Sequence, residues 1–518
     1  MQTPHQANCK QLLSALLLMV ALLPLRAQTG TSEAWVTNGS KRMENQAEQA
    51  LETNTRAAAR ITLDPSVTYQ KIDGFGWMLN QGSAKLLMQL PADDRHALLE
   101  ELFGVNGLNA SMVRVAIGAC DLSESDYTYA DSKDETLSNF AIDNRDLTTV
   151  VPILQEILTI NPQVKVLACS WTAPTWMKTG TAWYNSYVDG TLKTEYYSLY
   201  ADYFLKYINT MAAWGISIWG ISVQNEPLNN HNDPSMTWTK EAMYKFIAGS
   251  LGPTLRDNGH TAVRIIAYDH NCDVTDFPIH VAKSKYVYGT AFHLYAGDIS
   301  ALSTVYNSTG KPVLFTEQYT GKDGDFSGDL GWHVQNVVLG SLKNMSTTAL
   351  EWNLCSDPDC SIHTSGGCTT CQGALTINAS SISSRNVSYY IIGHASRVID
   401  PGAMRIGAES GASNLTFAAA ANPDGSIGVV AYNDANQARM LAIALPDEEE
   451  RTVYANHTLP AKGVMSVRIH PVAHTTIQNV VTSSEQQTLQ ARKFLSNGEL
   501  LLQLPDGTTY DIIGRTIR

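Results

Sequence analysis

Eight short apolar segments between residues 71 and 355 constrain the fold of this chain more than any other feature of its sequence. Most are continuously apolar, as are parallel strands buried on both faces of a sheet. Helical patterns fall between most of them, as in residues 91–103 and 194–214. Eight strand–helix units close into an α/β fold, the (β/α)8 TIM barrel, which we predict for residues 71–394. The expected strands cover residues 71–76, 112–118, 164–171, 218–227, 264–270, 288–295, 312–319 and 348–354.

Polar and aromatic side chains stand at the C-terminal ends of nearly all these strands, the end where barrels place their active sites. An unpaired carboxylate in an apolar core is costly, so Glu226 and Glu317 are hard to explain as core residues. One such glutamate could pair with a barrel arginine, whereas two of them, on strands four and seven, indicate a site. The strand-end residues are Trp171, Asn225, Glu226, Asp269, His293, Tyr295, Glu317 and Trp352.

Strands four and seven are not neighbours, so Glu226 and Glu317 should face each other across the barrel mouth. Glycoside hydrolysis needs such a pair, with one carboxyl group protonated to assist the leaving oxygen and the other ionised to attack the anomeric carbon. We expect the retaining separation of about 5–5.5 Å, with Asn225 binding the 2-hydroxyl of the sugar. His293 and Tyr295 lie two apart on one strand and point the same way, which favours a site role for His293 over that of a core histidine.

Several motifs resemble those of glycoside hydrolase family 30, which includes relatives of lysosomal glucosylceramidase and microbial β-1,6-glucanases. They are VQNEP around Glu226, LFTEQYTG around Glu317, IDGFG at the barrel start, RVAIGACDLSESDYTYAD (114–131), SWTAPTWMKT (170–179) and EWNL (351–354). The resemblance covers about residues 60–470, and one departure is Cys169-Ser170 where the family has Ser-Pro.

The resemblance implies that Glu226 is the acid/base and Glu317 the nucleophile, with Arg114 supporting the nucleophile electrostatically. It implies no metal or organic cofactor, and an attached β-sandwich domain formed by N- and C-terminal segments, residues 61–70 and 395–475. Seven residues would line the subsite for the cleaved sugar: Arg114, Asp121, Trp171, Asn225, His293, Tyr295 and Trp352.

These roles predict how the two carboxyl groups divide their protons. Arg114 and Tyr295 should favour the charge of Glu317 and keep its pKa low. Glu226 lies opposite another negative carboxylate, which disfavours its ionisation and should raise its pKa.

The substrate is expected to be a β-glucan or β-glucoside, with a β-1,6 linkage favoured. Residues 291–302, 324–344 and 366–377 resemble the bacterial branch near the β-1,6-glucanases, whereas endo or exo action stays open. The alternatives are a glucosylceramidase-like β-glucosidase and a family 30 xylanase. A non-catalytic glycan-binding protein on a barrel scaffold is a further class, which the intact carboxylates argue against.

The chain ends suggest export from a bacterial cell to the medium, the periplasm or the cell surface. Residues 1–27 have the basic start and short apolar run of a signal peptide, and no other stretch is long enough for an integral membrane span. We expect a linker at 28–60, and at 476–518 a tail that is either a sorting segment or a β-hairpin. The net charge of −13 argues against nucleic acid as a partner, and we expect a monomer.

Four cysteines cluster after the last barrel strand. Export favours disulfides over zinc there, and we expect the pairs Cys355–Cys360 and Cys368–Cys371 in a loop over the barrel mouth. Cys120, Cys169 and Cys272 lie in or beside apolar strands and should be buried thiols.

Overall fold

The computed structural model describes residues 30–447 and 450–471, and four short strands between residues 492 and 517. The chain divides into two compact units, Met1–Val472 and Ala473–Arg518. The predicted signal peptide lies outside the described residues. Among the residues that are described, no helix has the length and apolar character needed to cross a bilayer.

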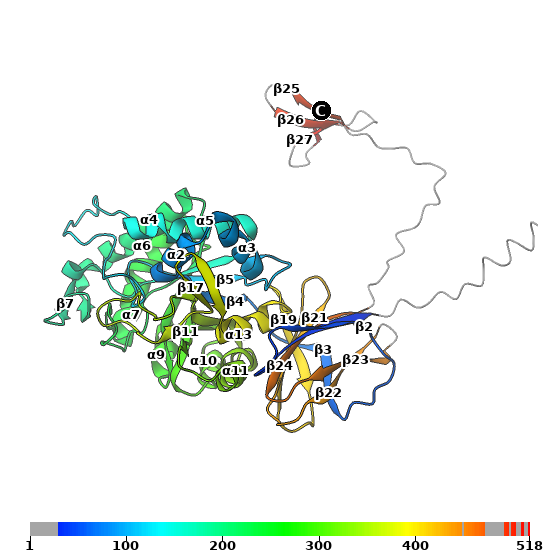
Figure 1. Cartoon of the computed structure of the whole chain (residues 1–518). Helices are drawn as coiled ribbons and strands as arrows, with labels where there is room; N and C mark the ends of the chain where they lie inside the picture. The colour runs from blue at the N-terminus through cyan, green and yellow to red at the C-terminus, as the bar shows by residue number, and fades with distance from the viewer. Residues whose placement is uncertain are drawn as a thin grey trace, which may run out of the picture. The chain divides into compact units, whose positions relative to one another are not determined.

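The predicted barrel is confirmed: eight parallel strands close on one another in chain order (Figure 1). Side chains alternate along each strand, so Met112 and Arg114 face the interior while Val113 packs toward the surrounding helices. A layer of buried apolar side chains, which includes Leu167 and Leu314, fills the interior. The strands are β4 (Gly74–Met78), β5 (Met112–Ala116), β6 (Lys165–Cys169), β9 (Ile218–Ser222), β10 (Arg264–Cys272), β11 (Val287–Gly297), β12 (Val313–Glu317) and β14 (Ser346–Asn353).

Helices cover the outside of the barrel. The helix predicted after Pro91 is α3, with Asp93 and Asp94 in its first turn, where acidic groups favour the helix dipole. The helices are α2 (Gln81–Gln89), α3 (Ala92–Phe103), α4 (Asn144–Thr148), α5 (Val150–Ile160), α6 (Tyr197–Ala213), α7 (Lys240–Phe246), α8 (Gly252–Asp257), α9 (Asp276–Val281), α10 (Ala301–Thr309), α11 (Phe326–His333), α12 (Leu339–Lys343) and α13 (Val387–Ser396).

Several short strands lie within the loops at the C-terminal end of the barrel. The loop after β6 forms a hairpin of β7 (Lys178–Thr181) and β8 (Asp189–Leu192). β13 (Thr320–Gly321), just beyond Glu317, pairs with β16 (Cys371–Gln372). The remaining loop strands are β15 (Cys355–Ser356), β17 (Leu375–Asn378) and β18 (Ser381–Arg385).

The second layer of the large unit is the β-sandwich, a nine-stranded sheet in the order β2-β1-β24-β21-β20-β19-β3-β22-β23. Strands that are distant in this order share one apolar core, as Val36, Ile61 and Met465 do, so the sheet curls over itself. The strands are β1 (Thr31–Thr37), β2 (Glu44–Ala50), β3 (Ala59–Lys71), β19 (Met404–Glu409), β20 (Leu415–Ala421), β21 (Ile427–Asn433), β22 (Arg439–Pro446), β23 (Thr452–Leu459) and β24 (Gly463–His470).

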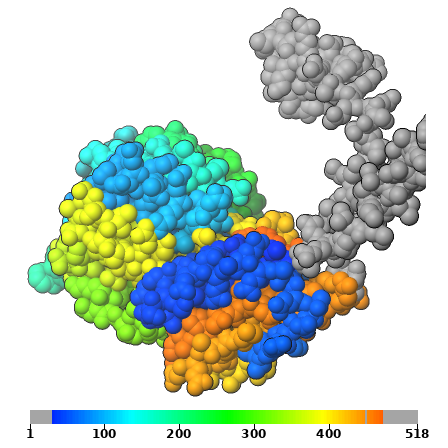
Figure 2. Space-filling view, turned by 45° about the vertical axis from the view of Figure 1, so that its right-hand side comes forward, coloured from blue at the N-terminus to red at the C-terminus, as the bar shows by residue number. Residues whose placement is uncertain are grey.

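The linker predicted at 28–60 was wrong, because most of it belongs to the sandwich. β1 pairs along its whole length with β24, and β2 pairs with β1 (Figure 2, blue against orange). β2 has the sequence ENQAEQA and is almost entirely exposed. It is an edge strand held by backbone hydrogen bonds, so it lacks the apolar alternation that identifies a strand in a sequence.

The C-terminal unit holds an antiparallel four-stranded sheet, where the sequence predicted either a sorting segment or a β-hairpin. Its strands are β25 (Arg492–Ser496), β26 (Glu499–Gln503), β27 (Thr509–Asp511) and β28 (Thr516–Ile517).

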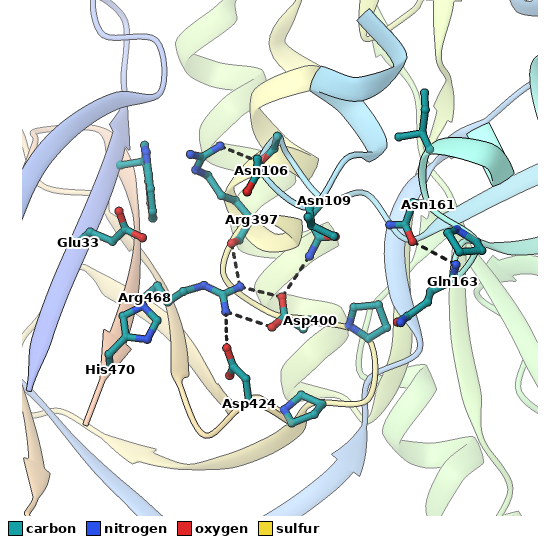
Figure 3. Close-up of a pocket in the computed structure, with 17 residues that line it drawn as sticks. Glu33, Asn106, Asn109, Asn161, Gln163, Arg397, Asp400, Asp424, Arg468 and His470 are labelled. Carbon is teal, nitrogen blue, oxygen red and sulfur yellow. Dashed lines mark hydrogen bonds and ion pairs between the residues drawn. The ribbon is translucent and has the colours of Figure 1, made fainter. Parts of the chain in front are cut away.

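A polar groove of about 680 Å³ lies between the barrel and the sandwich, lined by the loops that precede β5 and β6 (Figure 3). It is therefore at the opposite end of the barrel from Glu226 and Glu317. Its central contact is the Arg468 guanidinium, which donates to the Asp400 carboxylate at 2.7 and 3.0 Å. The Arg468 side chain also donates to the carbonyl of Arg397. The groove is thus a domain seam whose main charges are already paired.

We expect Arg468→Met to lower the free energy of unfolding by about 1–3 kcal/mol, because Asp400 would lose its ion pair at a partly buried seam. Denaturant unfolding followed by tryptophan fluorescence measures the loss. Lys462→Met is the control, since Lys462 pairs with Asp434 at the surface, where each side chain is 48% exposed, and should matter by about 0–1 kcal/mol. Equal effects of the two substitutions would contradict this assignment.

Candidate active site

Glu226 and Glu317 meet at the C-terminal end of the barrel strands. Glu317 is the last residue of β12, and Glu226 lies in a turn beyond β9 with a φ of 46°. The backbone N–H of Glu226 donates to the carbonyl of Asp269 at 2.9 Å, which fixes this turn to the next strand. Both glutamates are only 5% exposed, so each carboxyl group needs partners within the protein.

The two carboxyl groups face each other with His293 between them. One oxygen atom of each carboxyl group and a ring nitrogen of His293 all lie within 4.8 Å of one another. Retaining glycosidases separate their carboxyl groups by about 5–5.5 Å, whereas inverting enzymes need about 6.5–9.5 Å to admit a water. The spacing therefore suits direct attack by a carboxylate. The three groups could also surround a cation, but ion pairs with neighbouring cationic side chains already balance the carboxylates.

The fully buried Arg114 guanidinium links the groups of the site. Its Nη1 donates to Glu317 Oε2 at 2.5 Å, and its Nη2 donates to Asn225 Oδ1 at 2.7 Å and to Asp269 Oδ2 at 2.9 Å. Burial would lower the pKa of Arg114, but the charge of Asp269 and its other partners hold that pKa well above its usual range. Arg114 is a permanent cation, and Asn225 keeps its Nδ2 donor without a partner within the described chain.

Asp269 is a site residue that the sequence-based set omitted, although it was recognised as a strand end. Its fully buried carboxylate accepts from Arg114, from the hydroxyls of Ser222 and Thr316 at 2.6 Å each, and from the Cys169 thiol at 3.2 Å. Burial raises the pKa of Asp269, but the charge of Arg114 and these hydrogen bonds hold it well below its usual range. Asp269 is therefore the fixed anion beneath the site.

His293 bridges three carboxylates. Its Nε2 donates to Asp269 Oδ1 at 3.2 Å, and its Nδ1 donates to Glu226 Oε1 at 2.9 Å and lies 3.5 Å from Glu317 Oε1. Burial would lower the pKa of His293, but the charge of Glu317 and the other two carboxylates raise it to about 10. The imidazole is therefore protonated at neutral pH, and its site role was predicted from its place beside Tyr295.

The predicted pKa order of the two glutamates is reversed. Burial would raise the pKa of Glu226, but the hydrogen bond and charge of His293 lower it to about 2, helped by the Asn229 amide at 2.8 Å from Oε2. The Asn232 amide donates to the same oxygen at 3.2 Å. Burial raises the pKa of Glu317 and outweighs the charges of His293 and the guanidinium. The proton nearest to Glu226 therefore resides on His293.

The predicted contact between Tyr295 and Glu317 is present. The phenol donates to Glu317 Oε1 at 3.1 Å, while the backbone N–H of Tyr295 donates to Asn271 Oδ1 and fixes the strand end. The Tyr295 ring is 39% exposed and lies 5.8 Å from the ring of Tyr319. Tyr295 thus reaches from the site to its rim.

Two tryptophans and an aspartate complete the predicted subsite. The rings of Trp171 and Trp352 lie 5.8 Å apart and 4.9 and 5.9 Å from the guanidinium of Arg114, so they contact its faces. The buried Nε1 donor of Trp171 has no partner among the residues that the structure describes. Burial and the charge of Glu317 raise the pKa of Asp121 to about 7. An unpaired donor and a half-buried carboxyl group are suited to binding hydroxyls.

The cysteine loop contains one of the two predicted disulfides. Cys368 and Cys371 are bonded, whereas Cys355 and Cys360 are buried free thiols, so that pairing was wrong. The Asp357 carboxylate accepts the backbone N–H groups that flank Cys360, and its carbonyl accepts that of Cys360 itself. This turn, rather than a disulfide, sets the course of the segment.

The disulfide lies beside the wall of the predicted subsite. Cys371 belongs to a buried cluster with Trp171 and Trp352, and its strand β16 pairs with β13 directly beyond Glu317. Since Trp171 and Trp352 contact Arg114, the disulfide loop supports the wall of the predicted subsite. The three other cysteines predicted to be buried thiols are so: Cys120, Cys169 and Cys272.

Comparison with known proteins gives matches over nearly all of the large unit. The glycosyl hydrolase family 30 TIM-barrel domain matches residues 72–399, and the family 30 β-sandwich domain matches residues 402–467. An endo-1,6-β-D-glucanase of Aspergillus fumigatus is 32% identical, over 72% of this chain and 81% of that protein. The lysosomal acid glucosylceramidase of Mus musculus is 26% identical, over 79% and 84%. A solved endo-β-1,6-glucanase is 33% identical, with a TM-score of 0.77, over 84% and 99%.

Asp269→Asn should lower the pKa of His293, because the imidazolium would lose one of the charges that raise it. The folded pKa of about 10 exceeds the ordinary 6.5, so the imidazolium stabilises the fold fully below pH 6.5, and this stabilisation is lost as pH rises toward 10. We expect the variant to lose this stabilisation at lower pH, and its free energy of unfolding to be about 3–5 kcal/mol lower. NMR titration of the imidazole and thermal unfolding measure both.

Thr316→Val is the matched control, because it removes one hydrogen bond to the same carboxylate but no charge, and should cost about 1.5–3 kcal/mol. An unchanged pKa of His293 in Asp269→Asn would refute the coupling of these two residues.

Proposed function

The chain belongs to glycosyl hydrolase family 30, as its motifs indicated, and from this membership we propose that it hydrolyses β-1,6-linked glucan with retention of configuration. It is a glycoside hydrolase, and the observation that carries the retaining mechanism is the close approach of two opposed carboxylates. The first step of this mechanism needs a nucleophile held in place, and Arg114 and Tyr295 hold Glu317 in this way.

In the proposed first step, Glu317 Oε1 attacks the anomeric carbon while the bond to the leaving oxygen breaks and Glu226 delivers a proton to that oxygen. The product is a glucosyl ester of Glu317. Arg114 holds Glu317 Oε2, so this oxygen stays in place while the other one reacts. In the second step Glu226 takes a proton from a water, the water oxygen bonds to the anomeric carbon, and the ester bond breaks.

We propose that Glu226 and His293 share the proton of the first step across their 2.9 Å hydrogen bond. In the free enzyme this proton is on His293, and Glu226 is ionised. Glu226 passes to the leaving oxygen the proton that it takes from His293 across this hydrogen bond, and in the second step it hands the proton taken from the water back to His293. Formation of the ester removes the charge of Glu317, which is the main charge that raises the pKa of His293. The pKa of His293 is therefore lower while the ester exists, which favours release of its proton, and it rises again when the ester bond breaks.

The β-1,6 linkage and endo action are proposed because a curated relative and a solved structure, at 32% and 33% identity, are both named endo-β-1,6-glucanases. A glucosylceramidase-like β-glucosidase is the second candidate, since that relative is 26% identical. The xylanases among the solved structures are at most 22% identical and support only the shared fold.

A substrate panel with product sizing tests the proposal directly. It contains β-1,6-, β-1,3- and β-1,4-glucans, xylan and glucosylceramide. We expect β-1,6-glucan to be cleaved fastest into oligosaccharides of several sizes. Fastest cleavage of glucosylceramide would establish the second candidate, and turnover of none of the panel would favour a binding protein.

We propose export on the sequence of residues 1–27. The Cys368–Cys371 disulfide supports this, because disulfides persist in oxidising compartments. Mass spectrometry of the protein from its native cells should find a chain that begins at Gln28.

Glu317→Gln should lower kcat by at least about 10³-fold, because no ester can form without the nucleophile.

Glu226→Ala should abolish turnover of substrates with poor leaving groups but retain glycosylation by activated aryl glucosides, with azide restoring turnover. The measurement compares the hydrolysis rates of aryl glucosides that have good leaving groups with those of aryl glucosides that have poor ones. The control is Glu124→Gln, which changes an exposed carboxylate paired with Lys85 and should have little effect. If azide restores nothing, the role given to Glu226 is wrong.

His293→Asn should move the alkaline limb of kcat/KM to lower pH by more than about one unit. In the native enzyme the shared proton is held by a group whose pKa is about 10. Without the imidazole, the proton must reside on Glu226 alone, whose pKa should rise because burial and Glu317 disfavour its charge. Profiles from pH 4 to 10 on a glucoside with a poor leaving group measure the limb. An unmoved limb would argue against proton sharing.

A further inference from the structure

Two adjacent aromatic side chains project from the tip of the β7–β8 hairpin. Trp183 is 95% exposed, more than any other large apolar side chain in the described part of the chain, and Tyr184 is 64% exposed. Their rings are 5.7 Å apart and nearly perpendicular. Large aromatic side chains are usually buried at least in part, so an exposed pair points to a binding role.

The hairpin stands at the same end of the barrel as the two catalytic carboxylates proposed above. It follows β6 in the chain, after the strand has reached its C-terminal end. Figure 1 shows β7 on the side of the barrel away from the sandwich. The aromatic pair is thus far from the domain seam and belongs to the face that substrate approaches.

The base of the hairpin is rigidly held. The Lys178 ammonium donates to the carbonyls of Tyr187, Asp189 and Ser235 at 2.9–3.0 Å. Burial lowers the pKa of Lys178 to about 7. The three hydrogen bonds to carbonyl oxygens therefore fix the position of its side chain. A fixed platform binds a ligand without the entropic cost of ordering a loop.

The hairpin is joined to the loop that begins at Glu226. The backbone N–H of Ser235 donates to the carbonyl of Tyr187, and that of Thr237 donates to Gly190. Asn185, next to the tip, donates to Asp233 at 2.9 Å. A general acid stands beside the leaving group, because it protonates the glycosidic oxygen. The hairpin therefore flanks the path by which the leaving-group part of a long substrate extends from the site.

We propose that Trp183 and Tyr184 bind the leaving-group side of a polysaccharide substrate, beyond the sugar that is cleaved. This proposal rests on the proposed function. The occupant is a neutral glycan, since the C–H faces of pyranose rings match exposed aromatic rings. Each aromatic side chain can bury about 150–250 Å², so the pair falls short of the roughly 800 Å² per partner that a stable protein dimer needs.

The test compares kcat/KM on a soluble polysaccharide with kcat/KM on an aryl β-glucoside, whose leaving group carries no sugar. We expect the double variant Trp183→Ala/Tyr184→Ala to lower the ratio of polymer to aryl rates about tenfold. Trp183→Phe should recover most of the loss, because the ring remains. Trp332→Ala, which removes an exposed tryptophan on α11, is the matched control and should leave the ratio unchanged.

The polysaccharide is whichever member of the glucan and xylan panel the native enzyme cleaves fastest, so an error in the proposed linkage does not remove the test. The proposal is overturned if the double variant keeps the native ratio, or if the native enzyme cleaves the aryl glucoside but no polymer. It is also overturned if size-exclusion chromatography finds a dimer that the double variant dissociates, because the pair would then be a contact between copies.

Discussion

The Arg114 guanidinium, a fully buried cation, holds the active site together. Removing such a charge from water costs several kcal/mol, and the barrel offsets this with two carboxylates, an amide oxygen and two aromatic faces in direct contact. Each of these partners comes from a different barrel strand or the turn beyond it. The position of Glu317 is therefore a property of the whole barrel mouth, and it depends on the apolar layer of Met112, Leu167 and Leu314 below.

The loops around the mouth depend on one another in a similar way. Asn185 of the hairpin donates to Asp126 from the loop after β5 and to Asp233 from the loop after β9. Asp233 in turn accepts from the backbone N–H of Gly366 in the cysteine loop. Four loops that are separate in the sequence thus share one polar cluster, so the rim is a connected frame rather than four independent segments.

The barrel and the two glutamates were predictable because their signals are local. Continuous apolar runs mark strands buried on both faces, and carboxylates at their ends stand out against them. The sandwich edge strand β2 carries no such signal. The proton distribution was predicted wrongly because the contact of His293 with Glu226 joins side chains from different strands, and its 2.9 Å length depends on how both side chains turn. Asn229 and Asn232 follow VQNEP closely, but only the fold aims them at Glu226.

The pairing of β1 with β24 has a consequence for how the chain folds. The strand at residues 31–37 emerges first during synthesis, yet the strand that it pairs with, residues 464–470, emerges only after the entire barrel sequence. Contacts between such distant segments form slowly, because the entropy cost of closing a long loop must be met before these contacts stabilise the fold. The sandwich can be completed only after residue 470 has been synthesised. The barrel can therefore assemble earlier, while β1 and β3 still lack their C-terminal partner strands. A chain truncated before β24 would leave β1 and β21 as unpaired edges, open to aggregation.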